Sequence, residues 1–205
     1  MAINNKDLRE VGAHAVSAAD ELARVLKPTT ALDWEQLTPD LAWTQSQTAI
    51  HTMRACLEYS YQVVGKKLDT YQPVLFEKKE VATPADYLLM IPTAARVLSR
   101  VVATAEPEDR AWHAYGESDP IGFAAMGVVE VSVHTYDLGK GFGIEFTPLE
   151  APSEFAITRL FADTVETSAD FASESWGKKL LWYAGRIELA GMPRREGWKW
   201  NGRVR

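Results

Sequence analysis

The residues best suited to chemistry are a glutamate and a histidine four positions apart, Glu130 and His134. Their neighbours in the stretch GFAAMGVVEVSVH are nearly all apolar, and an ionised carboxylate is rarely buried unless it is paired or ligated. On an α-helix, residues four apart share a face, with their Cβ atoms about 6 Å apart. A third ligand from a facing helix would complete a three-residue metal site with an open position, which is the arrangement of catalytic zinc.

His51 is the best candidate for that third ligand. Its neighbours Ile50 and Met53 are apolar, and side chains that face the interior of a helical bundle commonly build metal sites. The residues alone leave a simpler interpretation open. In it, Glu130 and His134 form an ordinary intrahelical pair, and His51 is a core histidine.

Helical spacing of the apolar residues predicts the elements that would position these side chains. The four main predicted helices cover residues 5–26, 44–61, 83–102 and 121–138, and two further helices cover residues 153–172 and 176–185. Thr44 begins a capping-box pattern, and Thr83 precedes a first-turn proline. Pro92 predicts a kink in the third helix. We expect residues 27–42 to form a connection with a short helical turn around Trp34.

The fourth segment is ambiguous, because residues 129–134 alternate between apolar and polar types as in a half-buried strand. The apolar stretch from Ile121 to Leu138 is longer than a typical strand, and its neighbours are all predicted helices. A buried bundle helix is the more consistent interpretation. Only that interpretation lets Glu130 and His134 hold one ion, since residues four apart on a strand are about 13 Å apart.

The composition is that of an ordinary globular chain. Hydrophobic residues make up 46% and charged residues 24% of the 205 residues, which argues against a disordered or collagen-like protein. A net charge of −6 disfavours a nucleic-acid partner. The start MAINNKDLRE lacks the features of a signal peptide, and no apolar run approaches the roughly 20 residues of a membrane span. Because the lone Cys56 cannot form an internal disulfide, we expect a cytoplasmic protein.

Four further residues are candidates for a site. His113, in a polar loop, is a candidate proton donor or substrate contact, or else a surface histidine. Asp137 can orient a ligand histidine or contact substrate, or can be a solvated acid near the helix end. Arg186 and Arg194, in the basic C-terminal region, can bind an anionic substrate or the carboxylate of a cofactor. The alternative is a packing strap formed together with the tryptophans of that region, Trp182, Trp198 and Trp200.

Two segments, DWEQLTPDLAWTQSQTAIHTMRA and GVVEVSVHTYDLGKGFG, are similar to the signature regions of a known family. The sequence resembles the DinB-like, mycothiol-dependent maleylpyruvate isomerase N-terminal family of the actinobacterial type. The matching positions are Trp43 through His51, together with Glu130, His134, Tyr136, Asp137 and Leu138. The resemblance extends over about residues 5–145, and LLWYAGRIELAGMPRREGWKW is similar to the ending of actinobacterial members.

The resemblance implies an all-α fold. Residues 1–147 would form a DinB-like up-and-down four-helix bundle, and residues 148–205 a helical extension that packs on it and ends in a Trp- and Arg-rich tail. His51, Glu130 and His134 would hold zinc, with nickel, iron or manganese as alternatives. Maleylpyruvate isomerase itself has a separate α/β C-terminal domain, and the mostly helical prediction after Gly143 makes maleylpyruvate a doubtful substrate.

The resemblance also implies a reaction. The thiol of mycothiol would bind the open metal position as a thiolate and attack a small electrophilic substrate, with isomerisation or transfer as the outcome. We expect a monomer or homodimer. Two alternatives stay open, namely a metal-dependent hydrolase with His113 or Asp137 as base, and a non-catalytic metal-binding or stress-associated protein.

Overall fold

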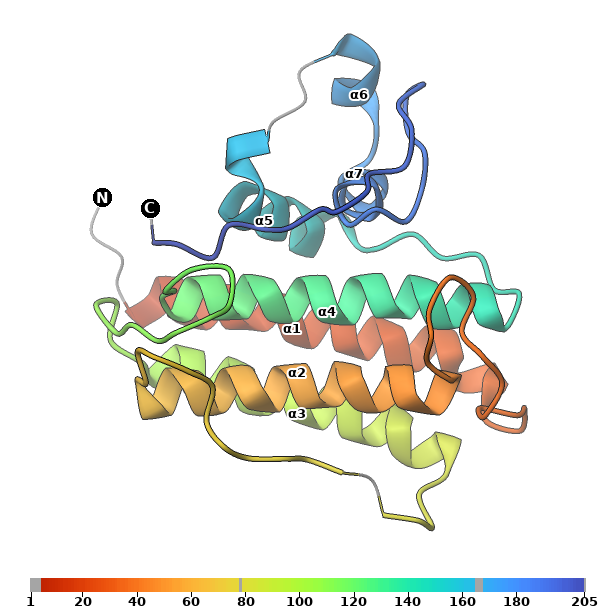
Figure 1. Cartoon of the computed structure of the whole chain (residues 1–205), viewed down its shortest axis with the longest axis horizontal. Coiled ribbons are helices and arrows are strands. Elements are labelled where there is room, and N and C mark those ends of the chain that lie inside the picture. The colour runs from red at the N-terminus through yellow and green to blue at the C-terminus, as the bar shows by residue number, and fades with distance from the viewer. Residues whose placement is uncertain (1–4, 78, 165–167, 205) are drawn as a thin grey trace.

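Seven α-helices form in the part of the chain that the computed structural model describes, residues 5–77, 79–164 and 168–204 (Figure 1). They are α1 (Asn5–Leu26), α2 (Gln45–Gly65), α3 (Pro84–Thr104), α4 (Pro120–Gly141), α5 (Glu150–Leu160), α6 (Ala169–Ser173) and α7 (Trp176–Tyr183). Two 3-10 turns, Lys27–Thr29 and Ala162–Thr164, complete the helical elements. Within those residues, extended structure is limited to isolated β-bridges. The prediction of an all-α protein is confirmed.

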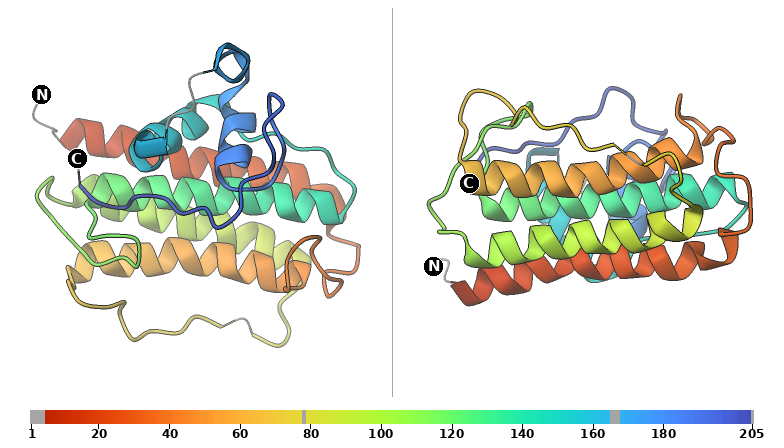
Figure 2. Two further views of the ribbon diagram at one scale, coloured as in Figure 1. Left: turned by 45° about the horizontal axis from the view of Figure 1, so that its top comes forward. Right: turned by 90° about the horizontal axis from the view of Figure 1, so that it is seen from below.

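The first four helices form a bundle around one apolar core (Figure 2). Each of α1 and α2 packs on both α3 and α4. Within the bundle, the largest fully buried aliphatic side chains lie on α1, α3 and α4 and include Leu22, Ile91, Leu98, Met126 and Leu138. This arrangement leaves α4 in contact with every other helix of the bundle.

The bundle does not have the predicted up-and-down topology, because α2 and α3 run in the same direction (Figure 1). Trp34, just before α2, packs on Tyr87 in the first turn of α3 and on Phe142 at the end of α4, with ring centroids 5.6 and 5.1 Å apart. Eighteen residues separate Gly65 from Pro84. About ten extended residues are enough to span the roughly 30 Å length of such a helix, so this connection returns along the bundle before α3 begins.

The predicted N-caps of α2 and α3 form as capping boxes. The Thr44 amide donates to Gln47 Oε1 over 2.9 Å, and the Thr83 amide donates to Asp86 Oδ2 over 2.7 Å. The predicted helical turn around Trp34 is wrong, since the only turn of helix within residues 27–44, all of which the structure describes, is Lys27–Thr29. The Trp34 indole is buried instead, and its Nε1 donates to the Thr29 carbonyl over 3.0 Å.

The C-terminal region packs on one side of the bundle. Helix α5 packs on both α4 and α1, and α7 packs on α5. The single helix predicted for residues 153–172 is wrong. The helix α5 ends at Leu160, and a new helix begins after Ser168, whose hydroxyl accepts from the Phe171 amide. After α7, the chain runs back across α4 (Figure 2). There the Gly202 amide donates to the Tyr115 carbonyl over 3.0 Å.

By length and composition alone, α3 is long and apolar enough to cross a membrane. In this structure it is a bundle helix whose buried face, including Ile91, Leu98 and Val102, packs on α1 and α2. Core helices commonly combine such composition with one buried face.

Candidate metal centre

The segment that carries Glu130 and His134 is helical, so the alternation of residues 129–134 does not form a strand. The helix α4 contacts α1, α2, α3 and α5. A helix enclosed on most sides needs apolar residues around nearly its whole circumference, and this requirement produces the strand-like run of valines. The four-residue spacing of Glu130 and His134 therefore places both side chains on one face.

His51 on α2 meets these two side chains across the helix interface. Its Nε2 lies 3.1 Å from Glu130 Oε2, and His134 Nε2 lies 3.4 Å from the same oxygen. The His51 and His134 rings are perpendicular, with centroids 5.0 Å apart. One donor atom from each of the three residues lies within 4.8 Å of the others. The structure thus brings together all three residues of the predicted metal site.

Asp137 fixes the orientation of His134. Its Oδ2 lies 2.9 Å from His134 Nδ1. The other ring nitrogen, Nε2, therefore faces Glu130 and His51. A carboxylate on the far nitrogen is the usual way in which proteins orient a metal-binding histidine.

Arg186 in turn fixes Asp137. Its Nε and Nη2 donate to the two oxygens of Asp137 over 3.1 and 2.8 Å. This fork-shaped pair is enclosed, because the Asp137 side chain is only 5% exposed and that of Arg186 only 13%. Arg186 was predicted to bind an anionic substrate or the carboxylate of a cofactor. In the structure it binds the carboxylate of Asp137.

Tyr59 contributes to the centre in a way that the sequence analysis missed. Its hydroxyl donates to Glu130 Oε1 over 3.1 Å, which leaves Oε2 directed at the two histidines. A signal for this role was present, because Tyr59 follows His51 by eight residues, and positions four and eight apart share a helix face.

The charges of the cluster are strongly coupled. Burial by itself raises the pKa of Glu130, but hydrogen bonds with His134 and His51 outweigh it and hold that pKa well below its usual range. Burial by itself lowers the pKa of His134, but its hydrogen bonds with Asp137 and Glu130 raise it to about 9. Burial and the nearby Glu130 raise the pKa of Tyr59 well above its usual value. Positive charge is therefore favoured between these carboxylates.

A cation fits this donor set. Two imidazole nitrogens and one carboxylate oxygen are ligands that zinc accepts. Ligand atoms about 2.0–2.1 Å from a tetrahedral zinc are separated by about 3.3–3.4 Å, close to the 3.1 and 3.4 Å separations at Glu130 Oε2. The carboxylate of Asp137 at His134 Nδ1 is also the kind of partner that a metal-bound imidazole usually has.

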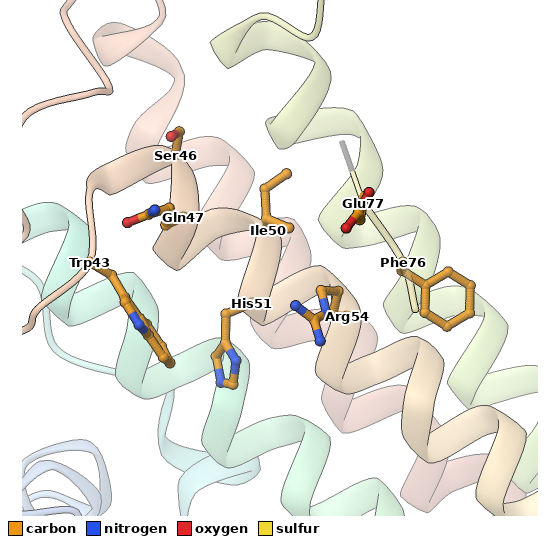
Figure 3. Close-up of a pocket in the computed structure, with 8 residues that line it drawn as sticks. All are labelled: Trp43, Ser46, Gln47, Ile50, His51, Arg54, Phe76 and Glu77. Carbon is orange, nitrogen blue, oxygen red and sulfur yellow. The ribbon is translucent and has the colours of Figure 1, made fainter. Parts of the chain in front are cut away.

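The three residues of the centre line a cavity of about 270 Å³. One wall is formed by α2 and α4, and the other by the C-terminal region through Arg186, Trp198 and Trp200. A second, larger hollow of about 460 Å³ (Figure 3) adjoins it, because Trp43 and His51 line both. The Trp43 ring lies 4.7 Å from the His51 ring.

The other predicted site residues are placed less directly. His113 is buried among aromatic rings, 5.9 Å from Tyr59 and 5.7 Å from Trp200, and its Nδ1 accepts from the Tyr115 amide over 3.0 Å. Burial lowers the pKa of His113 to about 4, so the ring is neutral near pH 7. Arg194 lies outside both hollows, where it pairs with the exposed Asp40 over 3.3 Å.

Comparisons of this chain with protein-family models, with curated proteins and with solved structures find no match.

Proposed function

We propose that this protein is a divalent-metal-dependent enzyme that uses a small thiol to attack a small electrophilic substrate. The observation that carries the proposal is the convergence of His51 Nε2, Glu130 Oε2 and His134 Nε2 beside a cavity, with a carboxylate behind His134. The resemblance of two segments to the mycothiol-dependent family supports the same reaction class and makes mycothiol the proposed thiol.

Zinc is the proposed metal, with His51, Glu130 and His134 as its protein ligands. When bound, it would supply an open coordination position that favours the thiolate form of a thiol, and the thiolate is the nucleophile. Three protein ligands suit such a catalytic site better than a structural one, which usually has four.

The chain's own residues have separate tasks in this scheme. Asp137 and Tyr59 hold the ligands His134 and Glu130 in position. Trp198 and Trp200 line the cavity and limit the access of water. The thiolate sulfur would bond to an electrophilic carbon of the substrate. In a transfer, a leaving group departs with its electron pair, and in an isomerisation the new carbon–sulfur bond breaks again and returns the thiol.

The hydrolase alternative has less support, because both groups suggested as its base are engaged. The two oxygens of Asp137 accept from Arg186, and one of them also contacts His134. His113 lies behind Tyr59 and does not line the cavity of the centre. Glu130 would itself be a ligand.

The test combines metal analysis with a thiol assay. Purified protein should contain about one zinc per chain, and His134→Ala should lose it. A matched control is His14→Ala, since His14 stacks on Phe155 at 4.8 Å and belongs to no metal-ligand cluster within the described residues. The loaded protein should accelerate the reaction of mycothiol with 1-chloro-2,4-dinitrobenzene, with bacillithiol and glutathione as comparison thiols. Metal retained without His134 would overturn the site, and absence of thiol-dependent turnover would overturn the reaction.

A further inference from the structure

The 460 Å³ hollow beside the metal centre is a groove along α2. Figure 3 shows the His51 ring between the Trp43 indole and the Arg54 guanidinium, all three projecting to the same side of α2. Phe76 and Glu77, from the connection between α2 and α3, line the opposite side. Because Arg54 follows His51 by three residues, its Cβ lies about 5–6 Å from that of His51.

Arg54 has hydrogen-bonding capacity that the protein does not use. Its Nε is buried and has no hydrogen-bond partner in the part of the chain that the structure describes. Its Nη2 has only a long contact of 3.4 Å with Glu58 Oε1. Buried donors are nearly always paired. The rest of the guanidinium can be reached, because the Arg54 side chain is 35% exposed and lines the groove. An arginine of this kind binds a carboxylate through charge-assisted hydrogen bonds.

The rest of the groove determines what can accompany such a carboxylate. Ile50 and Phe76 provide apolar walls, and Trp43 provides an aromatic face next to His51. Two acids lie nearby, Glu58 and the exposed Glu77. They disfavour a ligand with several negative charges around Arg54. The groove therefore suits one carboxylate attached to a compact, largely apolar body.

We infer that this groove is a subsite for a carboxylate-bearing ligand, with the guanidinium of Arg54 as its receptor. The inference rests on the proposed function, since it places the reactive end of the ligand beside His51 and its carboxylate one helical turn away. The carboxylate can belong to the electrophilic substrate, or to a thiol other than mycothiol, which has no free carboxylate. Arg54 would discriminate against neutral analogues of either one.

Calorimetric titration with matched probes tests the inference. The probes are 3-mercaptopropionate, its neutral analogue 3-mercaptopropan-1-ol, and succinate as a thiol-free carboxylate. Each is titrated into wild-type protein, Arg54→Gln and Arg96→Gln, with and without zinc. Arg96 is the matched control because it is a half-exposed arginine that pairs with Asp20 over 2.6 Å. It lies on α3 and pairs with α1, away from the groove.

The expected result is that zinc-loaded wild-type protein prefers the carboxylate thiol over the alcohol by roughly tenfold or more, the scale of one charge-assisted hydrogen bond. Arg54→Gln should abolish that preference and the binding of succinate, while Arg96→Gln keeps both. An unchanged preference in Arg54→Gln, or no binding of either carboxylate to wild-type protein, overturns the subsite.

The two proposals fail differently. If neither thiol responds to zinc but succinate binding still depends on Arg54, thiol use is wrong and the subsite stands. If both proposals hold, Michaelis constants show which reactant carries the carboxylate. If Arg54→Gln raises the Michaelis constant of the thiol alone, the carboxylate belongs to the thiol. If it raises that of a carboxylate electrophile alone, the carboxylate belongs to the substrate.

Discussion

Replacement of Asp137 by asparagine should weaken metal binding and destabilise the protein through the same contacts. The asparagine side chain keeps the shape of the aspartate but removes the charge that faces Arg186, and it turns one acceptor oxygen into an NH₂ donor. The enclosed Arg186 guanidinium then loses its two-point partner, whose contacts are now 2.8 and 3.1 Å. His134 Nδ1 loses a charged acceptor at 2.9 Å.

The magnitudes follow from burial. Breaking a buried ion pair from one side costs about 3–5 kcal/mol. We expect the unfolding free energy of the metal-free protein to fall by about 3 kcal/mol. This is the lower end of that range, because asparagine still offers one acceptor. Loss of the carboxylate behind a metal-binding histidine weakens metal affinity by about 10–100-fold, which corresponds to about 1.4–2.7 kcal/mol.

Two measurements separate these effects. Zinc affinity is determined by competition with a chromophoric chelator, and stability by urea unfolding of the metal-free protein. The control is Asp40→Asn, since Asp40 also pairs with an arginine of the C-terminal region but is half-exposed. Surface pairs of that kind contribute at most about 1 kcal/mol. Zinc affinity in Asp137→Asn equal to that of wild-type protein would refute the reasoning about His134.

Four other experiments test the site and the fold. Because the raised pKa of His134, about 9, keeps it protonated in the metal-free protein, zinc uptake at pH 7.5 should release about one proton, seen calorimetrically as a heat that depends on the buffer. The same shift stabilises the metal-free protein fully below the ordinary pKa of 6.5, and this stabilisation should disappear in unfolding experiments as pH rises through about 9. Tyr59→Phe should weaken zinc binding about three- to tenfold, measured by chelator competition, because Glu130 loses one hydrogen bond. Gly177→Ala should lower the unfolding free energy by at least about 2 kcal/mol in urea, since an added Cβ would lie 2.1 Å from the Pro148 carbonyl oxygen.

The two substitutions have matched control variants. Tyr61→Phe removes a hydroxyl from a half-exposed tyrosine on the same helix and should leave zinc affinity unchanged. Ser173→Ala, on the exposed side of α6, should change stability by less than about 0.5 kcal/mol. Zinc binding with the same heat in buffers of different protonation enthalpy would show that His134 is already neutral. Wild-type stability in Gly177→Ala would show that α7 can move away from Pro148.

Local patterns in the sequence predicted much of the architecture. The bounds of α1, the N-caps Thr44 and Thr83, and the helical state of residues 121–138 all follow from patterns within one segment. The meeting of His51 with Glu130 spans 79 residues of chain. It could be anticipated only because both side chains are polar residues on apolar helix faces.

The relations that the sequence did not predict depend on tertiary placement. The direction of α3 depends on the path of residues 66–83, whose length permits either a loop or a return along the bundle. Arg186 carries the same charge as Arg194, and nothing local distinguishes the buried partner of Asp137 from the exposed partner of Asp40. For Arg54, the spacing from His51 was visible, but the missing partner of its Nε appears only in three dimensions.

Unequal enclosure of the three proposed ligands determines the side from which a molecule can approach the centre. The His134 and Glu130 side chains are 8% and 13% exposed, whereas that of His51 is 36% exposed. The C-terminal region, through Arg186 and Trp198, lines the cavity beside α4, so access is greatest along α2. Since Arg54 lies one turn from His51 on that helix, an approaching carboxylate would meet its guanidinium beside the proposed metal position. Substitutions in the C-terminal wall should therefore act mainly on stability and ligand geometry, and substitutions of groove residues such as Arg54 mainly on the choice of substrate.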